Sequence, residues 1–353
     1  MRRLTLICLA LLLGFATQAP ASAAAAPRTA ARVATHLTFT VRAIGTGPFV
    51  PSAVNNRGLV AGTDRATGHA ALLNLKTGAQ KDLGTLGGYG SEGRAINDKG
   101  QVVGWADLKG GPTHAFLWDP RTKHMKDLGT LGGSFSNGFA INNRGQVAGG
   151  AYTASGELHA FLWDPRTKKH MKDLGTLTGG PSQAYGINDQ GQVVGWADLA
   201  GVSSAFLWNP RTHHMIDLGL LPRTVETSAR SINNRGEIVG FGSNAGDYTS
   251  RAFIWTPHTN KLRPLTGLPA GSNEAYAIND RGYVVGTVVS PDWQTQMSYV
   301  WNSRTHKTTL LPGLDKENTF ATVPSDINDS LRIVGVSGGN GALWTPRCGV
   351  GHR

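Results

Sequence analysis

The chain has 353 residues, with 34 Lys and Arg against 23 Asp and Glu, and a formal net charge of +11. Its two cysteines exclude a disulfide-rich scaffold, and the basic excess favours anionic partners without indicating a fold. The sequence has no P-loop, HExxH, G-x-S-x-G or zinc-type cysteine pair, so no common catalytic motif assigns an activity.

Residues 1–23 have the pattern of a secretory signal peptide. Arg2 and Arg3 precede an apolar run, Leu4 to Phe15, and Ala21-Ser22-Ala23 fits a cleavage site. This run is too short to span a bilayer, and no later stretch is apolar enough, so we expect no membrane span. We expect a secreted, extracellular, monomeric product. Residues 24–36 are interpreted as a disordered Ala-rich leader and 347–353 as a flexible tail with the single thiol of Cys348.

From residue 37 onward the sequence predicts short strands. Leu37 to Ile44 alternates as a strand does. A hairpin signal then recurs seven times: an apolar residue, Asn, Asn or Asp, any residue, Gly, and an apolar run. The copies begin at Val54, Ile96, Ile141, Ile187, Ile232, Ile278 and Ile327. Leu331 replaces the glycine in the last copy, where we expect a distorted turn.

The second half of each repeat ends in a core such as Ala115-Phe-Leu-Trp118, followed by a turn and a short strand. One unit therefore predicts four strands, named a to d, of the types AxAIN, QVVGWA, HAFLW and HMKDL. Strands b and c are continuously apolar, which indicates cover on both faces. Seven four-stranded units at a period in the mid-forties predict an all-β fold, a seven-bladed β-propeller of antiparallel blades over residues 37–346.

The two ends of the repeat array predict how the ring closes. The last unit stops at Trp344 without a strand d, whereas the orphan strand Thr40 to Gly45 aligns with a strand d. We expect this N-terminal strand to complete the last blade, which removes exposed sheet edges. An open solenoid would instead need atypical capping repeats at both ends.

The motifs His114-Ala-Phe and His159-Ala-Phe, together with DLGTLGG and AIN-x-x-G-Q-V-x-G, resemble those of the HAF-repeat extracellular proteins. The resemblance covers about residues 38–346 and implies an exported, propeller-forming repeat protein without an established activity. The WDPRTKxM segment is also similar to the c–d hairpin of kelch propellers. The first unit, Ala-Ala-Leu-Leu, and the last two units depart from the HAF pattern.

Residues that recur in nearly every repeat are interpreted as structural. The Trp residues at 118, 163, 208, 255, 301 and 344 are expected to pack between blades. His69, His114 and His159 lie in neighbouring blades, too far apart for one metal ion. The Asn-Asp-x-Gly signal lacks the oxygen ligands of a calcium loop. We therefore predict no metal, no cofactor and no catalytic residue.

The expected connectivity places a–b and c–d turns on one face of the ring. That face collects many Arg and Lys residues, among them Arg57, Lys99 and Arg121, and is predicted to be basic. It is interpreted either as a solubilising rim or as a docking surface for an anionic envelope polymer.

The opposite face carries the d–a segments, among them GGYGSEG and GGSFSNG, and the b–c loops. The copies differ in these segments, so a specific site is expected there. The candidate ligand-binding residues are Arg94, Trp105, Tyr185, Trp196, Glu226, Arg230, Glu274, Tyr276, Asp292, Trp293 and Glu317. Four of these, Glu226, Glu274, Asp292 and Glu317, could supply a carboxylate pair for glycosidase or lyase chemistry.

The sequence thus favours a secreted propeller that acts as a binding or interaction module for carbohydrate or cell-envelope components. Its expected partner is a polysaccharide or an anionic envelope polymer, and no specific nucleic acid. The alternative is a secreted carbohydrate-active enzyme, a glycosidase or lyase. A purely structural surface protein is a third hypothesis.

Overall fold

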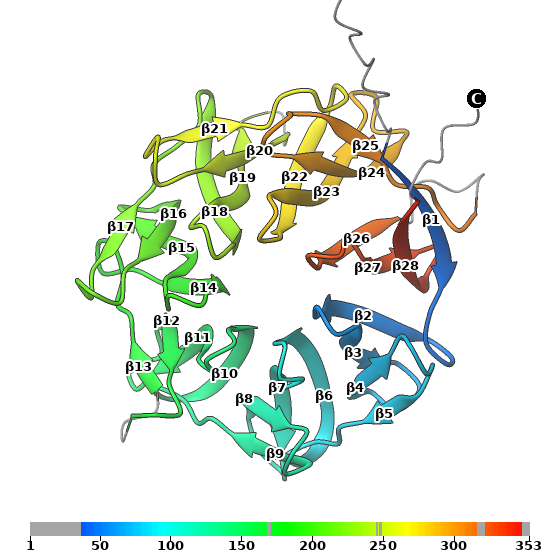
Figure 1. The fold of residues 1–353 in the computed structure, drawn as a ribbon. Helices are drawn as coiled ribbons and strands as arrows, with labels where there is room; N and C mark the ends of the chain where they lie inside the picture. Colours follow the sequence, from blue (N-terminus) through cyan, green and yellow to red (C-terminus); the bar gives the residue numbers. More distant parts are fainter. Residues whose placement is uncertain (1–36, 168–170, 245, 247–248, 316–321, 348–353) are drawn as a thin grey trace, which may run out of the picture. The chain divides into compact units, whose positions relative to one another are not determined.

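The computed structural model describes residues 37–347, apart from 168–170, 245, 247–248 and 316–321. The proposed signal peptide, the leader, the tail from Cys348 onward, and Glu317 lie outside this part. Arg347, predicted as the first residue of the flexible tail, is instead the last residue of the final strand. Within it, the regular elements are 28 β-strands in seven four-stranded antiparallel sheets. The sheets stand as blades around a ring (Figure 1), which confirms the predicted seven-bladed β-propeller.

Each blade runs from strand a at the centre of the ring to strand d at its rim (Figure 1). Blade 1 has β2 Phe49–Val54, β3 Leu59–Asp64, β4 His69–Asn74 and β5 Gln80–Asp82. Blade 2 has β6 Gly87–Ile96, β7 Val102–Leu108, β8 Thr113–Asp119 and β9 His124–Asp127. Blade 3 has β10 Gly132–Ile141, β11 Val147–Thr153, β12 Leu158–Trp163 and β13 Met171–Asp173.

The remaining blades follow the same plan. Blade 4 has β14 Ser182–Ile187, β15 Val193–Leu199, β16 Val202–Trp208 and β17 Met215–Asp217. Blade 5 has β18 Thr224–Ile232, β19 Ile238–Asn244, β20 Ser250–Trp255 and β21 Leu262–Pro264. Blade 6 has β22 Ser272–Ile278, β23 Tyr283–Val289, β24 Gln296–Asn302 and β25 Thr308–Leu310. Blade 7 has β26 Val323–Ile327, β27 Ile333–Ser337 and β28 Asn340–Arg347, with β1 Thr38–Ala43 as its outer strand.

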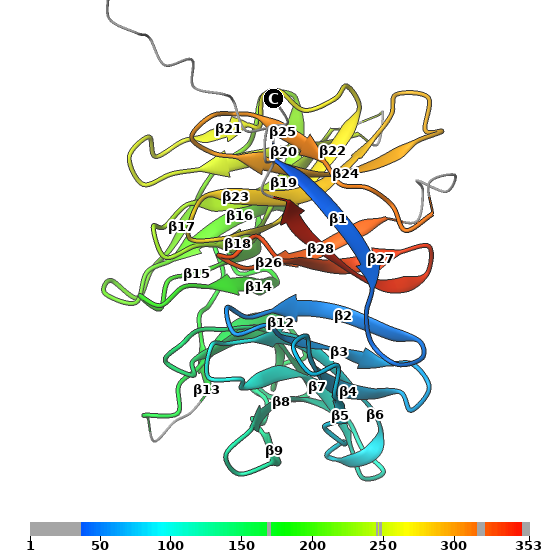
Figure 2. The same cartoon turned by 45° about the vertical axis from the view of Figure 1, so that its right-hand side comes forward.

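The N-terminal strand closes the ring as the sequence predicts. β1 lies antiparallel along β28 (Figure 2), in register from Thr38 opposite Arg347 to Ala43 opposite Ala342. Phe39 of β1 is buried in a cluster with Trp344 of β28 and Leu311 of blade 6. The first strand therefore completes the last blade and seals its junction with the blade before it.

The recurring tryptophans fill the junctions between blades, as expected. Trp118 packs with Ala61 and Leu83 of the preceding blade, and the ammonium of Lys81 lies 4.7 Å from the centre of its ring. Lys126 and Lys172 cover Trp163 and Trp208 in the same way. All six side chains are at most 6% exposed, so a role as sugar-stacking platforms is excluded for them.

Hydroxyl residues on the inner strands join neighbouring blades. The Ser91 hydroxyl accepts the N–H of Ala70 at 2.8 Å and donates to the carbonyl oxygen of Gly84 at 2.6 Å. Ser136, Ser182 and Thr227 repeat this arrangement in the next three blades. A repeated hydroxyl thus satisfies two backbone groups that the blade edges leave open.

Two local expectations are wrong. The Gly-rich segments GGYGSEG and GGSFSNG, predicted as d–a connections, belong to the inner strands β6 and β10. Glycine is needed there because a Cβ at Gly93 would lie 2.8 Å from the carbonyl oxygen of Gly62 in the preceding blade. The turn at Leu331 is not distorted either: Leu331 adopts φ 60°, like the glycines of the other copies, and donates its N–H to the Asn328 carbonyl.

Candidate functional site

Each inner strand carries a β-bulge three residues before its turn asparagine. In β6, for example, the register shifts between Gly93 and Ala95, so Arg94 has no partner on β7. The equivalent bulged residues in blades 1 to 7 are Ser52, Arg94, Phe139, Tyr185, Arg230, Tyr276 and Ser325. Bulges redirect side chains and are common beside functional sites.

The bulged side chains of blades 2 to 5 touch one another from blade to blade. The Arg94 guanidinium lies 5.3 Å from the Phe139 ring centre, and Phe139 meets Tyr185 edge to face at 5.2 Å. The Arg230 guanidinium follows at 4.4 Å from the Tyr185 ring. These residues form a cationic and aromatic arc, whereas blades 7 and 1 place small serines at the same position.

A cavity of about 170 Å³ lies at this arc, between blades 4 and 5. Four of its lining residues, Tyr185, Trp196, Glu226 and Arg230, are candidates predicted from the sequence. The other lining residues are Ser203, Thr227, Ser228, Phe241 and Ser243. Because Ser203 and Ser243 lie at the b–c ends of β16 and β19, the cavity belongs to the loop-bearing face, where a site is expected.

Arg230 is the central cation of this pocket. Its guanidinium carbon lies 4.4 Å from the ring centre of Tyr185 and 4.9 Å from that of Phe241. Trp196 Nε1 donates to the Tyr185 hydroxyl at 3.3 Å, and that hydroxyl donates to Gln183 Oε1 at 3.0 Å. Hydrogen bonds therefore hold the tyrosine while the two rings hold the arginine.

Several buried polar atoms near the arc have no hydrogen-bond partner among the described residues. They are Arg94 Nε, Asn137 Oδ1, Ser228 Oγ and Arg230 Nε. Buried polar groups in folded proteins are nearly always hydrogen-bonded, to protein or to another molecule. These four atoms are therefore left to water or to a ligand for their hydrogen bonds.

Blades 2 and 6 hold four more of the predicted residues. Trp105 Nε1 donates to Glu92 Oε2 at 2.9 Å, and the same carboxylate binds Arg94 at 3.1 Å. Glu274 Oε1 accepts the Ser250 hydroxyl at 3.1 Å. The Tyr276 hydroxyl lies 2.7 Å from Thr287 Oγ1, and burial, with Glu274 nearby, raises the pKa of Tyr276 to about 12. Tyr276 is thus a neutral hydroxyl at physiological pH.

The predicted carboxylates are not gathered in the pocket. Asp292 lies in the b–c turn of blade 6, where it accepts the Ser290 hydroxyl and the Gln294 N–H; these bonds lower its pKa. The neighbouring Trp293 is half exposed and lines no part of this pocket. Of the four candidates for a catalytic pair, only Glu226 lines the pocket within the described part of the chain, and Glu317 lies outside that part.

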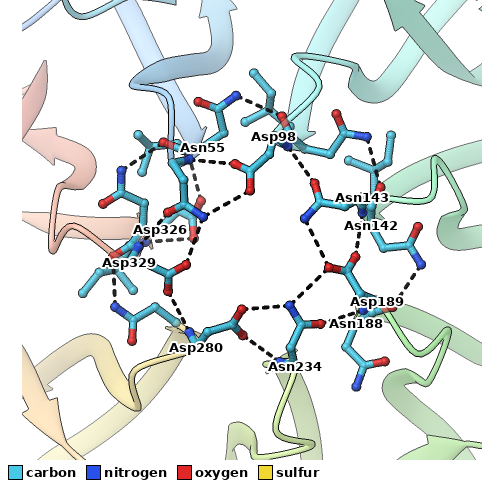
Figure 3. A pocket seen from close by; sticks show the side chains of 18 of the residues that line it. Asn55, Asp98, Asn142, Asn143, Asn188, Asp189, Asn234, Asp280, Asp326 and Asp329 are labelled. Carbon is cyan, nitrogen blue, oxygen red and sulfur yellow. Dashed lines mark hydrogen bonds between the residues drawn. The ribbon is translucent and has the colours of Figure 1, made fainter.

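At the other end of the inner strands, the turn asparagines form a closed ring (Figure 3). Asn142 is typical: its Oδ1 accepts the N–H groups of Arg144 and Gln146, which confirms the predicted turn chemistry. Its Nδ2 also donates to the carbonyl oxygen of Asn188 in the next blade. The other members are Asn55, Asn97, Asn188, Asn233, Asn279 and Asn328, and the last bond returns from Asn328 to Asn55.

The residues that follow these asparagines form a second ring (Figure 3). Each backbone N–H donates to the side-chain Oδ1 of the next member; the members are Asn56, Asp98, Asn143, Asp189, Asn234, Asp280 and Asp329. The face predicted to be basic therefore has an acidic centre. The amide groups of Asn56, Asn143 and Asn234 bind the carboxylates. Among the described residues, no group of three or more His, Cys, Asp or Glu side chains is arranged to hold a metal ion.

Acids at the rim of this face are paired with its arginines. Hydrogen bonds from Arg121 hold the pKa of Asp119 far below its usual range. Arg166 lowers the pKa of Asp164 to about 2 in the same way. The repeat histidines on strand c also have structural partners: His69, His114 and His159 bind Asp82, Asp127 and Asp173 of strand d.

Sequence reasoning missed Phe139 and Phe241, which complete the arc and the pocket. Phe139 lies three residues before its turn asparagine, as do Arg94, Tyr185, Arg230 and Tyr276, so the repeat alignment carried the signal for it. Phe241 takes the place of Trp196 in the next repeat, which is a weaker signal.

No family model and no curated protein matches the chain. Solved structures with the same fold include an oligogalacturonate lyase from Vibrio parahaemolyticus, at 13% identity and a TM-score of 0.60, covering 90% of this chain and 100% of that one. A second oligogalacturonate lyase structure, in complex with manganese, has 15% identity and a TM-score of 0.59, and the match covers 89% of this chain and 97% of that one. A streptogramin B lyase has 11% identity and a TM-score of 0.56, and the match covers 88% of this chain and 98% of that one.

At these identities the likeness establishes the fold alone, and the class is that of seven-bladed β-propellers. Within the described residues, no helix is long and apolar enough to cross a membrane.

Proposed function

We propose that this protein is a secreted binding module that holds a carbohydrate or cell-envelope ligand in the pocket between blades 4 and 5. The observation that carries the proposal is the guanidinium of Arg230, which lies against aromatic rings beside Tyr185 and Trp196. Its Nε has no hydrogen-bond partner among the described residues. Ligand sites typically combine aromatic walls with a few placed polar groups. Export of the mature chain rests on the N-terminal pattern of residues 1–23.

Binding is favoured over turnover because, among the described residues, Glu226 is the one carboxylate that lines the pocket. Glycosidases commonly place two carboxyl groups on either side of the bond they break. Two fold neighbours are named for lyase activity on oligogalacturonate, which keeps a carbohydrate-active enzyme as the alternative to be scored in the same experiment.

The test uses purified protein lacking residues 1–23, applied to a panel of oligosaccharides and to isolated cell walls. Retention and release of products are measured together. We expect saturable retention without products, and a loss of at least about tenfold, or 1.4 kcal/mol, in Tyr185→Ala. The matched control is Tyr89→Ala, since Tyr89 is 93% exposed on blade 2. Equal retention of both variants would refute this site, and product release abolished by Glu226→Gln would establish the enzyme.

A further inference from the structure

We infer that the pocket recognises an acidic sugar: the carboxylate of a uronic-acid unit binds the guanidinium edge of Arg230. This rests on the proposed function and specifies its ligand class. Tyr185 and Phe241 lie at the guanidinium, 4.4 and 4.9 Å from its carbon. Rings against the faces of a guanidinium leave its N–H edge for hydrogen bonds. That edge is a planar fork of donors that matches a carboxylate.

A comparison between blades shows why Arg230 lacks an acidic partner. In blade 2 the residue two before the bulge is Glu92, and its carboxylate binds Arg94 at 3.1 Å. In blade 5 the same position is Ser228, and among the described residues no carboxylate lies within 4.0 Å of Arg230. Both Ser228 Oγ and Arg230 Nε are buried without a partner in that part of the chain. One bulged arginine, Arg94, is therefore paired with a carboxylate of its own blade, whereas Arg230 forms no ion pair with any described carboxylate and has its guanidinium available for an external anion.

The rest of the pocket fits a sugar better than a phosphate polymer. Tyr185 and Trp196 offer aromatic surface for the apolar side of a pyranose ring, and Ser203, Ser228 and Ser243 offer hydroxyls to its oxygens. A volume of about 170 Å³ is below the roughly 300–1,000 Å³ that encloses a drug-sized ligand. One uronate unit enters, and the remaining chain of sugars continues over the loop-bearing face.

The direct test is titration calorimetry with tetragalacturonate, a hyaluronate tetrasaccharide, the carboxyl-reduced form of each, and polyglycerol phosphate. We expect the wild type to bind at least one uronate probe at least about tenfold more tightly than its reduced form. Arg230→Gln should remove this preference, and Arg230→Lys should retain part of it. Arg263→Gln, on the exposed outer strand β21, should leave it unchanged.

A second variant, Ser228→Glu, keeps Arg230 and places a glutamate at the position that Glu92 occupies in blade 2. The new carboxylate should pair with Arg230 and weaken uronate binding at least as much as Arg230→Gln does. Conversely, Glu226→Gln removes an exposed negative charge from the pocket rim and should tighten uronate binding without affecting the reduced probes. Thermal midpoints of all variants show whether each is folded. If Arg230→Gln does not fold, Ser228→Glu and Glu226→Gln still test the inference.

The outcomes separate the inference from the proposed function. Equal binding of uronate and reduced probes, lost in Tyr185→Ala, overturns the acidic specificity and leaves carbohydrate binding intact. Tighter binding of polyglycerol phosphate than of either uronate also overturns the inference. If the wild type binds no carbohydrate probe and no cell wall, the acidic-sugar inference and the proposed function are both wrong.

Discussion

Replacing Asn142 by alanine tests whether the asparagine ring holds the propeller closed. Its side chain is 4% exposed and makes four hydrogen bonds. It accepts from the N–H groups of Arg144 and Gln146 at 3.0 Å each, and donates to Gln146 Oε1 at 2.8 Å and to the Asn188 carbonyl at 3.0 Å. At about 1 kcal/mol net for each bond, Asn142→Ala should lower the free energy of unfolding by about 3–4 kcal/mol.

Asn142→Asp separates the two roles of this residue. The aspartate keeps the two acceptor bonds within the turn but loses both donor bonds, including the one to the next blade. We therefore expect a loss of at least about 2 kcal/mol at neutral pH, because the buried carboxylate also faces the Gln146 and Asn188 oxygens without a donor between them. Asn340→Ala, at the exposed first residue of β28, is the control and should change stability by less than about 0.5 kcal/mol. Urea denaturation measures all three, and a loss in Asn142→Ala no larger than in the control would refute the reasoning.

Three further predictions concern ring closure and the last blade. Removing residues 37–45 takes away the outer strand of blade 7 and should lower the thermal midpoint; an unchanged midpoint would contradict closure by β1. Leu331→Gly relieves a positive φ worth about 1–2 kcal/mol but deletes a buried side chain worth about 2–5 kcal/mol, so chemical denaturation should show a less stable protein. Burial raises the pKa of Asp326 from 3.8 to about 6, so between these pH values the folded state binds the extra proton and stability falls as pH rises. Asp326→Asn should lack this component of the pH dependence, and identical pH profiles would disprove it.

The architecture could be predicted because the residue types that determine it recur at the same positions of successive repeats. Seven turn signals, the tryptophan near the end of strand c in six of the seven blades, and the orphan strand Thr40 to Gly45 each have one structural explanation. Packing explains the tryptophans and edge pairing explains the orphan strand, so local pattern and global fold agree. The glycine-rich starts of β6 and β10 were mistaken for connections because glycine normally weakens strands. Here Gly88 and Gly133 are required because a Cβ at these positions would clash with β7 or β11, the neighbouring strand of the same blade.

The candidate site could be predicted only in part. Variation between copies led to Tyr185, Trp196, Glu226 and Arg230, which share one pocket. The sequence does not show which of the two arginines forms an ion pair, because this depends on a contact between residues two positions apart on a bulged strand. A bulge interrupts the alternation of side chains from which strand contacts are predicted. The asparagine ring was likewise beyond reach, because its Nδ2 bonds join residues 42 to 49 positions apart, or 273 at the closure, that only the closed ring brings together.

The two ends of the inner strands have different roles: one end stabilises the ring, and the other carries the candidate binding site. At the turn end, the two Asn and Asp rings use their own polar groups to join the blades. Toward the loop-bearing end, Ser228 Oγ and Arg230 Nε remain without partners among the described residues. Substitutions at the turn end should therefore change stability before binding, and substitutions in the pocket between blades 4 and 5 should change binding before stability.

A crystal structure of the mature protein with tetragalacturonate tests the central claim most directly. We predict a uronate unit between blades 4 and 5, with its carboxylate within hydrogen-bonding distance of Arg230 and its ring against Tyr185 or Trp196. Density for the oligosaccharide on the opposite face, along the arginines and lysines of the a–b and c–d turns, with an empty pocket at Arg230, would contradict it.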